Sequence, residues 1–537
     1  MKTASRAPTA AARTDFKPGI RPLPELAALP RPDEPAPLKV CVLLMSLALV
    51  PRILLLPWNE NLYGDAVIRT ELAERWLASP HWIASFADGA FQFGPLHLYL
   101  LALALKLWPS PELSSRVLSL VFGIATVVPL YLLTRRLFDW KAAVVACLAF
   151  STWGMHIQFS TTAGSESLAL FLVYGSLWLF AAGVEEGRFA PIGYSAVVLN
   201  FACATRYDAW LLIPVLSVLL LFGDRDRIAA VTRAVFFGLL CLPFPLIWMQ
   251  GNEVALGSPF APIHHIDEFH RAWVAEGLAR WGPVLYRLQN LFFWPGIAVV
   301  TLSPLVAFFG IAGIFRAWKQ RPQQRWLIWT ILIPTAYFTA RSAILLNFQP
   351  LGRFAATQVA LVLPYVWYGF ESLTERASST WKRALAILSV ATAVGLPVGL
   401  GLFTTQSEHK LAKSLRPIGP ISKNPEAVRQ VVQFIKERAK TEGAGIILDT
   451  DPQYSDMQIA FFSGLPEEKM ARYRWDTFQK RLLTAQPAYL IRIDGGLLAE
   501  NLDFGLEGSR ARLGDRWFEE VPGFQRPFHV YRPLNGR

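Results

Sequence analysis

The segment "GPLHLYLLALALKLWP", Gly94 to Pro109, decides the topology of this chain. It is apolar, but it is short, begins at a Gly-Pro pair and contains Lys106. If it crosses a bilayer, every later segment lies on the opposite side from where it otherwise would. The alternative is an amphipathic helix that lies in the membrane interface. The basic residues of the later loops distinguish a transmembrane from an interfacial position of this segment.

The composition is that of a polytopic helical membrane protein. The chain of 537 residues is 53% hydrophobic and 17% charged, whereas soluble domains carry about 25% charged residues. Its 19 Trp and 36 Phe supply side chains that are enriched at membrane interfaces. Repeated apolar runs of roughly 16 to 25 residues are long enough to cross a bilayer. The predicted spans are 39–57, 114–134, 142–159, 167–183, 190–205, 208–222, 230–249, 291–315, 326–346, 355–370 and 384–403.

Loop charges favour an interfacial position for Gly94 to Pro109. With that segment outside the bilayer, the cytoplasmic loops are "TRRLFDWK", "EEGR", "DRDR", "RAWKQRPQQR" and "TERASSTWKR". Nearly every basic cluster then lies inside, as the positive-inside rule requires. The prediction is about eleven spans in the plasma membrane, interfacial helices in the first external loop, a cytoplasmic N-terminus and an external C-terminus.

The two ends of the chain differ from its middle. Residues 1–38 are rich in Pro and Ala and carry scattered basic residues, which predicts a disordered cytoplasmic tail. Residues 404–537 show soluble periodicity: "NPEAVRQVVQFIKERAK" predicts a helix and "GIILDT" and "AYLIRI" predict buried strands. "FHVYRP" predicts an edge strand, because a proline ends it. We therefore expect a membrane domain over 39–403 and a small external α/β domain over 404–537.

The basic charge and the cysteines have ordinary explanations. The net charge of +12 falls mostly in the tail and the loops, which indicates topology signals and contacts with anionic lipids, not nucleic acid. The four cysteines lie in or at the edge of apolar runs, without metal-ligand spacing. "LDTDPQYSD", Leu448 to Asp456, is interpreted as a strand that ends in an Asp-Pro turn and not as a nucleotide-sugar motif.

Polar groups from distant parts of the chain converge on the predicted external side. They come from the loop 58–113, the turns 164–166 and 206–208, the loop 250–289 and the turn 347–354. Charged residues at a membrane surface are costly unless they are paired or used, so this convergence predicts a functional site.

A set of motifs in fixed order resembles a known family. After an acid that follows the first span come "PLHLYLLALALKLW", "SSRVLSLVFGIATVVPLYLLTRRLF", "FSTTAGSESLALF", "ATRYDAWLLIPVLSVLLL" and "LGRFAATQVALVLPY". Over about residues 40–370 this arrangement resembles the GT-C superfamily of membrane glycosyltransferases, close to the aminoarabinose transferase and protein O-mannosyltransferase branch. The resemblance implies an inverting glycosyltransferase that takes a hexose or pentose from a polyprenyl-phosphate carrier. It implies a lipid, glycan or protein acceptor on the external, periplasmic face.

Two departures limit what the resemblance implies. The family often has paired acids where this chain has Asp65-Ala66, and often a basic residue before the proline where this chain has Phe93-Gly94. The identities of donor and acceptor are therefore not carried over.

Asp65 and Glu166 are the candidate catalytic acids. In the family the matching first acid is the catalytic base, and a carboxylate within hydrogen-bond reach can accept the proton of an attacking hydroxyl. The alternative for Asp65 is an N-cap of a helix over 66–78. Glu166 could orient the acceptor or help to hold a divalent metal ion, and its alternative is an acid favoured by the helix dipole.

Arg206, Arg353 and, in addition, Arg116 are the candidate ligands of the donor phosphate. A guanidinium can form charge-assisted bonds to the phosphate that leaves during transfer. Their alternative is snorkelling at the interface. Tyr63, His264 and His265 are candidate acceptor contacts; "HHIDEFH" could suggest a metal site, but a solvated loop explains it as well.

Other classes of protein fit less well. A ligase or polymerase would use a pyrophosphate-linked oligosaccharide. A secondary transporter would place charges at the bilayer midplane and show inverted repeats, which this sequence lacks. A receptor or scaffold would not need acids and arginines together at the membrane face.

Overall fold

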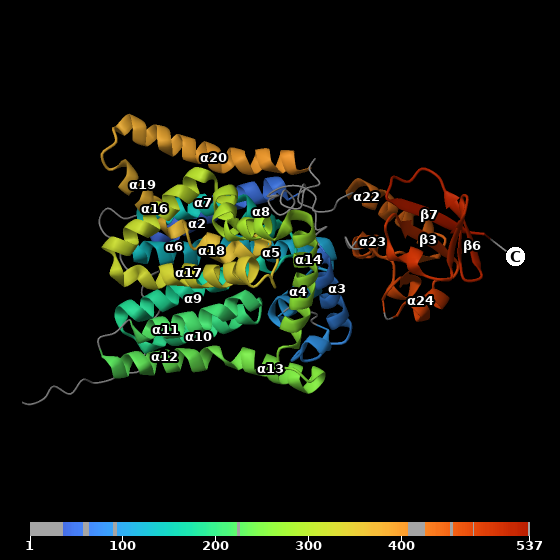
Figure 1. The fold of residues 1–537 in the computed structure, drawn as a ribbon, viewed down its shortest axis with the longest axis horizontal. Helices are drawn as coiled ribbons and strands as arrows, with labels where there is room; N and C mark the ends of the chain where they lie inside the picture. Colours follow the sequence, from blue (N-terminus) through green and yellow to red (C-terminus); the bar gives the residue numbers. More distant parts are fainter. Residues whose placement is uncertain are drawn as a thin grey trace, which may run out of the picture.

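The computed structural model describes residues 36–56, 64–89, 94–222, 226–405, 425–451, 455–475 and 477–534. A bundle of helices is followed by a C-terminal domain that lies beyond one end of the bundle (Figure 1). The helices of the bundle are α2 (Pro37–Leu55), α3 (Gly64–Ala78), α4 (Pro95–Leu107), α5 (Pro111–Ala125), α6 (Val127–Leu137), α7 (Trp140–Thr152), α8 (Gly154–Thr161), α9 (Glu166–Glu186), α10 (Phe189–Cys203), α11 (Leu212–Leu221), α12 (Arg227–Cys241), α13 (Pro243–Leu256), α14 (Ala261–Leu291), α15 (Phe293–Leu302), α16 (Pro304–Gln320), α17 (Arg325–Thr339), α18 (Ala356–Ala360), α19 (Val366–Thr374) and α20 (Ser379–Thr405).

The helical membrane class is confirmed, but the count of eleven spans is not. In the described part of the chain, 4 helices are long and apolar enough to cross a membrane, or up to 6 if each bent pair is one span. The pairs α7–α8 and α12–α13 are bent by 63° and 46°. Other predicted spans are broken: the run 291–315 divides into α15 and α16 at Ser303, where φ is 79°. Hydropathy detects an apolar run, whereas the break depends on backbone conformation.

The ambiguous segment forms the short helix α4, which has 13 residues and is thus only about 20 Å long. Its start is fixed against the end of α10, because the amide of Leu96 donates to the carbonyl of Ala204 at 3.0 Å. A side chain at Gly94 would overlap that carbonyl oxygen, so glycine permits this close approach.

Three of the loops predicted to be cytoplasmic, "TRRLFDWK", "EEGR" and "RAWKQRPQQR", lie together at one end of the bundle. Arg136 pairs with Glu185 at 2.7 Å and with Glu186 at 2.8 Å, which joins the loops after α6 and α9. Arg321 donates to the carbonyl of Leu137 at 3.2 Å. The basic clusters are therefore on one side, while their orientation to the cytoplasm stays a prediction.

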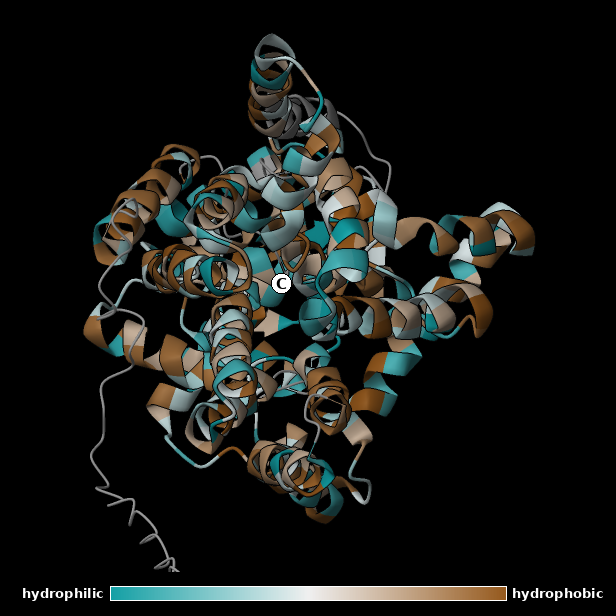
Figure 2. Cartoon of the chain, turned by 90° about the vertical axis from the view of Figure 1, so that its left-hand side faces the viewer, coloured by the Kyte–Doolittle hydropathy of each residue, from teal (hydrophilic) through white to brown (hydrophobic). Residues whose placement is uncertain are grey.

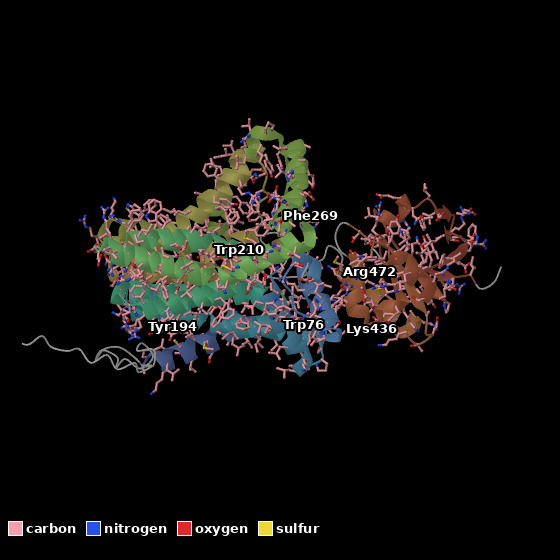
Figure 3. The ribbon with its side chains drawn as sticks, turned by 90° about the horizontal axis from the view of Figure 1, so that it is seen from below. Trp76, Tyr194, Trp210, Phe269, Lys436 and Arg472 are labelled. Carbon is pink, nitrogen blue, oxygen red and sulfur yellow. The ribbon has the colours of Figure 1, made fainter. Side chains whose placement is uncertain are left out.

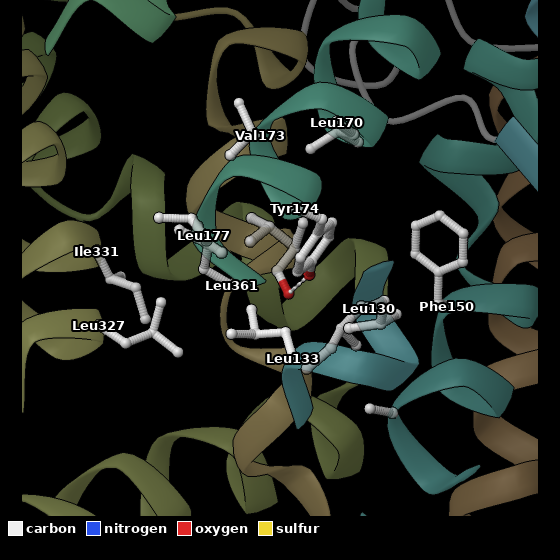
Figure 4. Packing of buried hydrophobic residues seen from close by; sticks show 14 of the residues in the cluster. Leu130, Leu133, Phe150, Leu170, Val173, Tyr174, Leu177, Leu327, Ile331 and Leu361 are labelled. Atoms are coloured by element: carbon white, nitrogen blue, oxygen red, sulfur yellow. Dashed lines mark hydrogen bonds between the residues drawn. The ribbon is translucent and has the colours of Figure 1, made fainter. Parts of the chain in front are cut away.

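The centre of the bundle is a packed apolar core (Figure 4). Leu133 of α6, Phe150 of α7 and Leu177 of α9 are fully buried in it, and the Tyr174 hydroxyl donates to the carbonyl of Ala360. The outer helices expose apolar side chains. Many helices of the bundle are largely brown, and thus hydrophobic, in the view from the end away from the C-terminal domain (Figure 2). On α2 the exposed apolar residues are Leu38, Val42, Leu43, Leu47, Val50, Ile53 and Leu54. This surface suits contact with lipid chains.

In its described residues, the C-terminal domain is a seven-stranded sheet with three α-helices. Its elements are α22 (Pro425–Phe434), β1 (Gly445–Leu448), α23 (Ser455–Ser463), β2 (Met470–Arg472), α24 (Phe478–Thr484), β3 (Ala488–Ile493), β4 (Phe504–Glu507), β5 (Arg510–Leu513), β6 (Arg516–Val521) and β7 (Phe528–Pro533). The strand order is β2-β1-β3-β7-β6-β5-β4, with β1 parallel to β2 and β3 and the other pairs antiparallel.

The predicted strands at "GIILDT" and "AYLIRI" are β1 and β3. The predicted edge position of "FHVYRP" is wrong, since β7 pairs with β3 on one side and with β6 on the other. Pro533 is the last residue of β7, where its missing amide hydrogen leaves the rest of the ladder intact.

Candidate active site

Asp65 and Arg353 form an ion pair near the end of the bundle that faces the C-terminal domain. Asp65 lies in the first turn of α3, and Arg353 lies in the 3-10 turn Gly352–Ala355 before α18. The Arg353 Nη1 donates to Asp65 Oδ2 across 288 residues of sequence. The side chains of Asp65 and Arg353 are 24% and 21% exposed, so a substrate can reach both. Helix α3 already includes Asp65, which corrects the expected N-cap position before residue 66.

A second charged group lies beside the first. Arg206 donates from Nη1 to Glu166 Oε1 at 2.8 Å and from Nε to Asp208 Oδ1 at 2.9 Å. Thr357 of α18 donates to the other oxygen of Asp208 at 3.5 Å. Since Thr357 follows Arg353 by four residues, this bond connects the Arg206 group to the Arg353 turn.

Two further residues of this region were not predicted from the sequence. Arg69 is one helical turn after Asp65, is buried, and acts electrostatically on Asp65, Glu166 and Arg206. The spacing Asp65-x-x-x-Arg69 on one helix face could have indicated it. His97 of α4 is also buried, and neither ring nitrogen has a hydrogen-bond partner within the described ranges. The sequence does not indicate His97 as a site residue, because a histidine in an apolar helix usually belongs to the core.

The surroundings make Asp65 a stronger base than an ordinary aspartate. The pKa of Asp65 is raised to about 6, mainly by burial; Arg69 and Arg206 oppose this increase, and nearby Glu166 contributes to it. Burial, together with Arg69 and Arg206, holds the pKa of His97 well below its ordinary value, so this imidazole is neutral. At neutral pH the site therefore contains an ionised carboxylate of raised basicity next to several guanidinium groups.

Arg116 has contacts of a different kind. Its Nε donates to the carbonyl of Thr161 at 2.8 Å, its Nη2 donates to the carbonyl of Leu56, and Nη1 lies 3.4 Å from Glu112. These bonds connect α5 to the ends of α2 and α8, and they favour a structural role over phosphate binding.

The two candidate acceptor contacts in the described residues, His264 and His265, lie on α14 and not on the elements of the two charged groups, and His265 has aromatic neighbours. His265 packs edge-on against Phe86 and Phe269, and His264 is exposed on α14. It is His270 that supports the Arg353 turn: its Nδ1 accepts from the amide of Gln349 at 3.1 Å, and its ring stacks on Phe348. Tyr63 lies outside the described residues.

The segments "HHIDEFH" and "LDTDPQYSD" both contain clustered acids or histidines. No group of three or more His, Cys, Asp or Glu side chains is placed to hold an ion in the parts of the chain that the structure describes. In "LDTDPQYSD", Asp449 accepts backbone amides of Thr450, Ile493 and Leu498. Asp451 accepts from the amide of Ser455, so both acids hold the turn.

Comparisons with known proteins agree with this architecture. The family model described as dolichyl-phosphate-mannose-protein mannosyltransferase matches residues 92–248. No curated protein matches the chain.

Two solved membrane enzymes share the fold. ArnT from Cupriavidus metallidurans, solved with undecaprenyl phosphate, superposes with a TM-score of 0.59 at 15% identity, over 92% of this chain and 98% of that chain. An Archaeoglobus fulgidus oligosaccharyltransferase superposes with a TM-score of 0.54 at 16% identity, over 92% of this chain and 74% of that chain. The predicted resemblance is confirmed: this chain has the fold of the GT-C membrane glycosyltransferases.

Proposed function

We propose that this protein is an inverting glycosyltransferase that moves a single sugar from a polyprenyl-phosphate carrier to an acceptor on the external face of the plasma membrane. The observation that carries the proposal is the ion pair between Asp65 and Arg353, with the Glu166–Arg206–Asp208 group beside it. A base for the acceptor and cations for the leaving phosphate are the two requirements of this reaction.

The proposed reaction is a single displacement. An acceptor hydroxyl attacks the anomeric carbon, and its proton passes to the carboxylate of Asp65. The bond between that carbon and the phosphate oxygen breaks, and its electron pair remains on the phosphate. Arg353 and Arg206 stabilise the negative charge that develops there. Attack opposite to the leaving group inverts the anomeric configuration.

The Asp65–Arg353 pair suits the state before the donor binds. A donor phosphate would compete with Asp65 for the Arg353 guanidinium. Once Arg353 turns to the phosphate, the Asp65 carboxylate is available to the acceptor hydroxyl. Binding of the donor would thus release the Asp65 carboxylate from Arg353 before the acceptor attacks.

The orientation and the donor are part of the same proposal. Basic loops gathered at one end of the bundle support a cytoplasmic position for that end, and in the proposed orientation Asp65 and the C-terminal domain are external. ArnT was solved with undecaprenyl phosphate, and an archaeal oligosaccharyltransferase of the same fold was solved with dolichol-phosphate. These ligands support a lipid-phosphate donor here.

Lipid mass spectrometry of cells tests the proposal. We expect a polyprenyl-phosphate monosaccharide to accumulate in a deletion strain and in cells with Asp65→Asn, but not with Asp515→Asn. Asp515 is exposed in the turn between β5 and β6, far in sequence from the site, and matches the change in charge. Accumulation of an undecorated pyrophosphate-linked oligosaccharide would instead support a ligase or polymerase. Unchanged levels of every lipid-linked sugar would contradict both the glycosyltransferase and the ligase or polymerase. Transport assays would then be the next experiment.

A further inference from the structure

Helix α3 carries charges on two separate faces. Asp65 and Arg69 point to the active site, whereas Glu71 and Arg75 contact the C-terminal domain. Successive helical residues advance by about 100°, so the two pairs are about 120° apart around the helix. The helix that holds the proposed base is thus also the helix on which the C-terminal domain rests.

The contact between Arg472 and Glu71 is the buried part of this interface. Arg472 Nη2 lies 3.3 Å from Glu71 Oε2, and the two side chains are only 4% and 15% exposed. The neighbouring pair between Arg75 and Glu467 has a shorter distance of 2.7 Å, but its side chains are 43% and 42% exposed. Exposed ion pairs contribute little, whereas removing one partner of a buried pair is strongly destabilising.

Trp475 fixes the direction of Arg472. The Arg472 guanidinium lies 3.5 Å from the centre of the Trp475 ring, and Arg75 of α3 approaches the same ring at 5.7 Å. Figure 3 shows Arg472 on the part of the C-terminal domain that faces the bundle, with Trp76 of α3 at the near end of the bundle. The indole therefore holds Arg472 in position for Glu71.

Arg472 bonds to the acid of α3 although an acid of its own domain is near. Asp456 of α23 is completely buried, and neither of its carboxylate oxygens accepts a hydrogen bond from a described side chain. It acts on Arg472 only through the electrostatic field. A buried guanidinium needs a bonded anion, and here Glu71 supplies it only when the domain is docked on α3.

From these contacts we infer that Arg472 is a positioning residue of the active site: through Glu71 it holds α3, and α3 holds Asp65 in place for the acceptor. This inference rests on the proposed function. Glu71 and Asp65 are six residues apart on one helix, which is about 9 Å along its axis, so a tilt at Glu71 moves Asp65. A displacement of about 1 Å at a reacting group can cost about a hundredfold in rate.

The test compares purified full-length Arg472→Ala, Arg472→Lys and Glu71→Gln with Arg532→Ala. Arg532 is a matched control, because it pairs with Glu519 inside the C-terminal domain. We expect Arg472→Ala and Glu71→Gln to lower kcat by about ten- to a hundredfold. Arg472→Lys should recover part of that loss, and Arg532→Ala should match wild type. Binding of polyprenyl phosphate without sugar should stay unchanged in all four variants, because the phosphate ligands are on other helices.

Hydrogen exchange supplies a readout that does not depend on activity. Amides of α3 should exchange faster in Arg472→Ala and Glu71→Gln, while amides of β1 and β3 keep their protection. Faster exchange in α3 with an unchanged kcat would overturn the positioning role, as would a loss of activity in Arg532→Ala of the same size. Unchanged exchange in α3 would overturn the docking contact itself. If wild type transfers no sugar, or if Asp65→Asn is fully active, the proposed function fails instead.

Discussion

The raised pKa of Asp65 predicts a specific dependence of transfer on pH. With a pKa of about 6 the carboxyl is ionised in about a tenth of molecules at pH 5 and about nine tenths at pH 7. Since only the ionised form accepts a proton, kcat/KM should rise about tenfold between these values. An ordinary aspartate, with a pKa near 3.8, would be almost fully ionised at both and would give an almost flat profile.

Two neighbouring residues should move this profile in opposite directions. Glu166 raises the pKa of Asp65, so Glu166→Gln should shift the midpoint to lower pH. Arg69 lowers that pKa, so Arg69→Gln should shift the midpoint to higher pH. The sign of each shift is independent of the loss in overall rate that either substitution causes.

The assay is transfer of sugar from a purified lipid-phosphate donor, with kcat/KM measured from pH 4.5 to 8.5. Neither a sugar phosphodiester nor a hydroxyl acceptor titrates in this range, and burial holds the pKa of His97 well below its ordinary value. The midpoint therefore reports the free enzyme. A flat profile between pH 5 and 7, or a shift of both variants in the same direction, would refute the assignment of Asp65 as the base.

The contacts of the other charged residues lead to further predictions. Arg353→Gln should weaken binding of polyprenyl phosphate by about ten- to a hundredfold in a lipid-binding assay, since a charge-assisted hydrogen bond contributes about 1.5–3 kcal/mol. Arg116→Gln should leave that affinity unchanged but lower the melting temperature of the protein, because buried carbonyls lose their donors. Equal losses of affinity in the two variants would contradict the structural role of Arg116. Burial raises the pKa of Asp456 to about 7, above its ordinary value of 3.8, so the folded domain loses stability as pH rises from about 4 to about 7. Asp456→Asn should remove this loss in pH-dependent melting, while Asp515→Asn should retain it.

Much of the site was predictable because each of its charges lies at the end of an apolar segment. Asp65, Glu166, Arg206 and Arg353 stand out in the sequence, since a charge at a membrane boundary is costly unless it is paired or used. Partners far apart in the sequence were not predictable: Asp65 pairs with Arg353 across 288 residues, and Glu71 pairs with Arg472 across 401 residues. Arg116 met the same sequence criterion, yet the fold directs it to backbone carbonyls.

By itself the sequence determined the helical membrane class, the separate C-terminal domain and the residue types of the site, because hydrophobicity and charge are local properties of a segment. Only the tertiary structure decided where the apolar runs break, as at Ser303 and at the 63° bend between α7 and α8. It also decided that β7 lies inside its sheet and that one face of α3 meets the C-terminal domain. These features depend on backbone conformation and on contacts between residues far apart in the chain. The hydrophobicity and charge of a single segment predict neither.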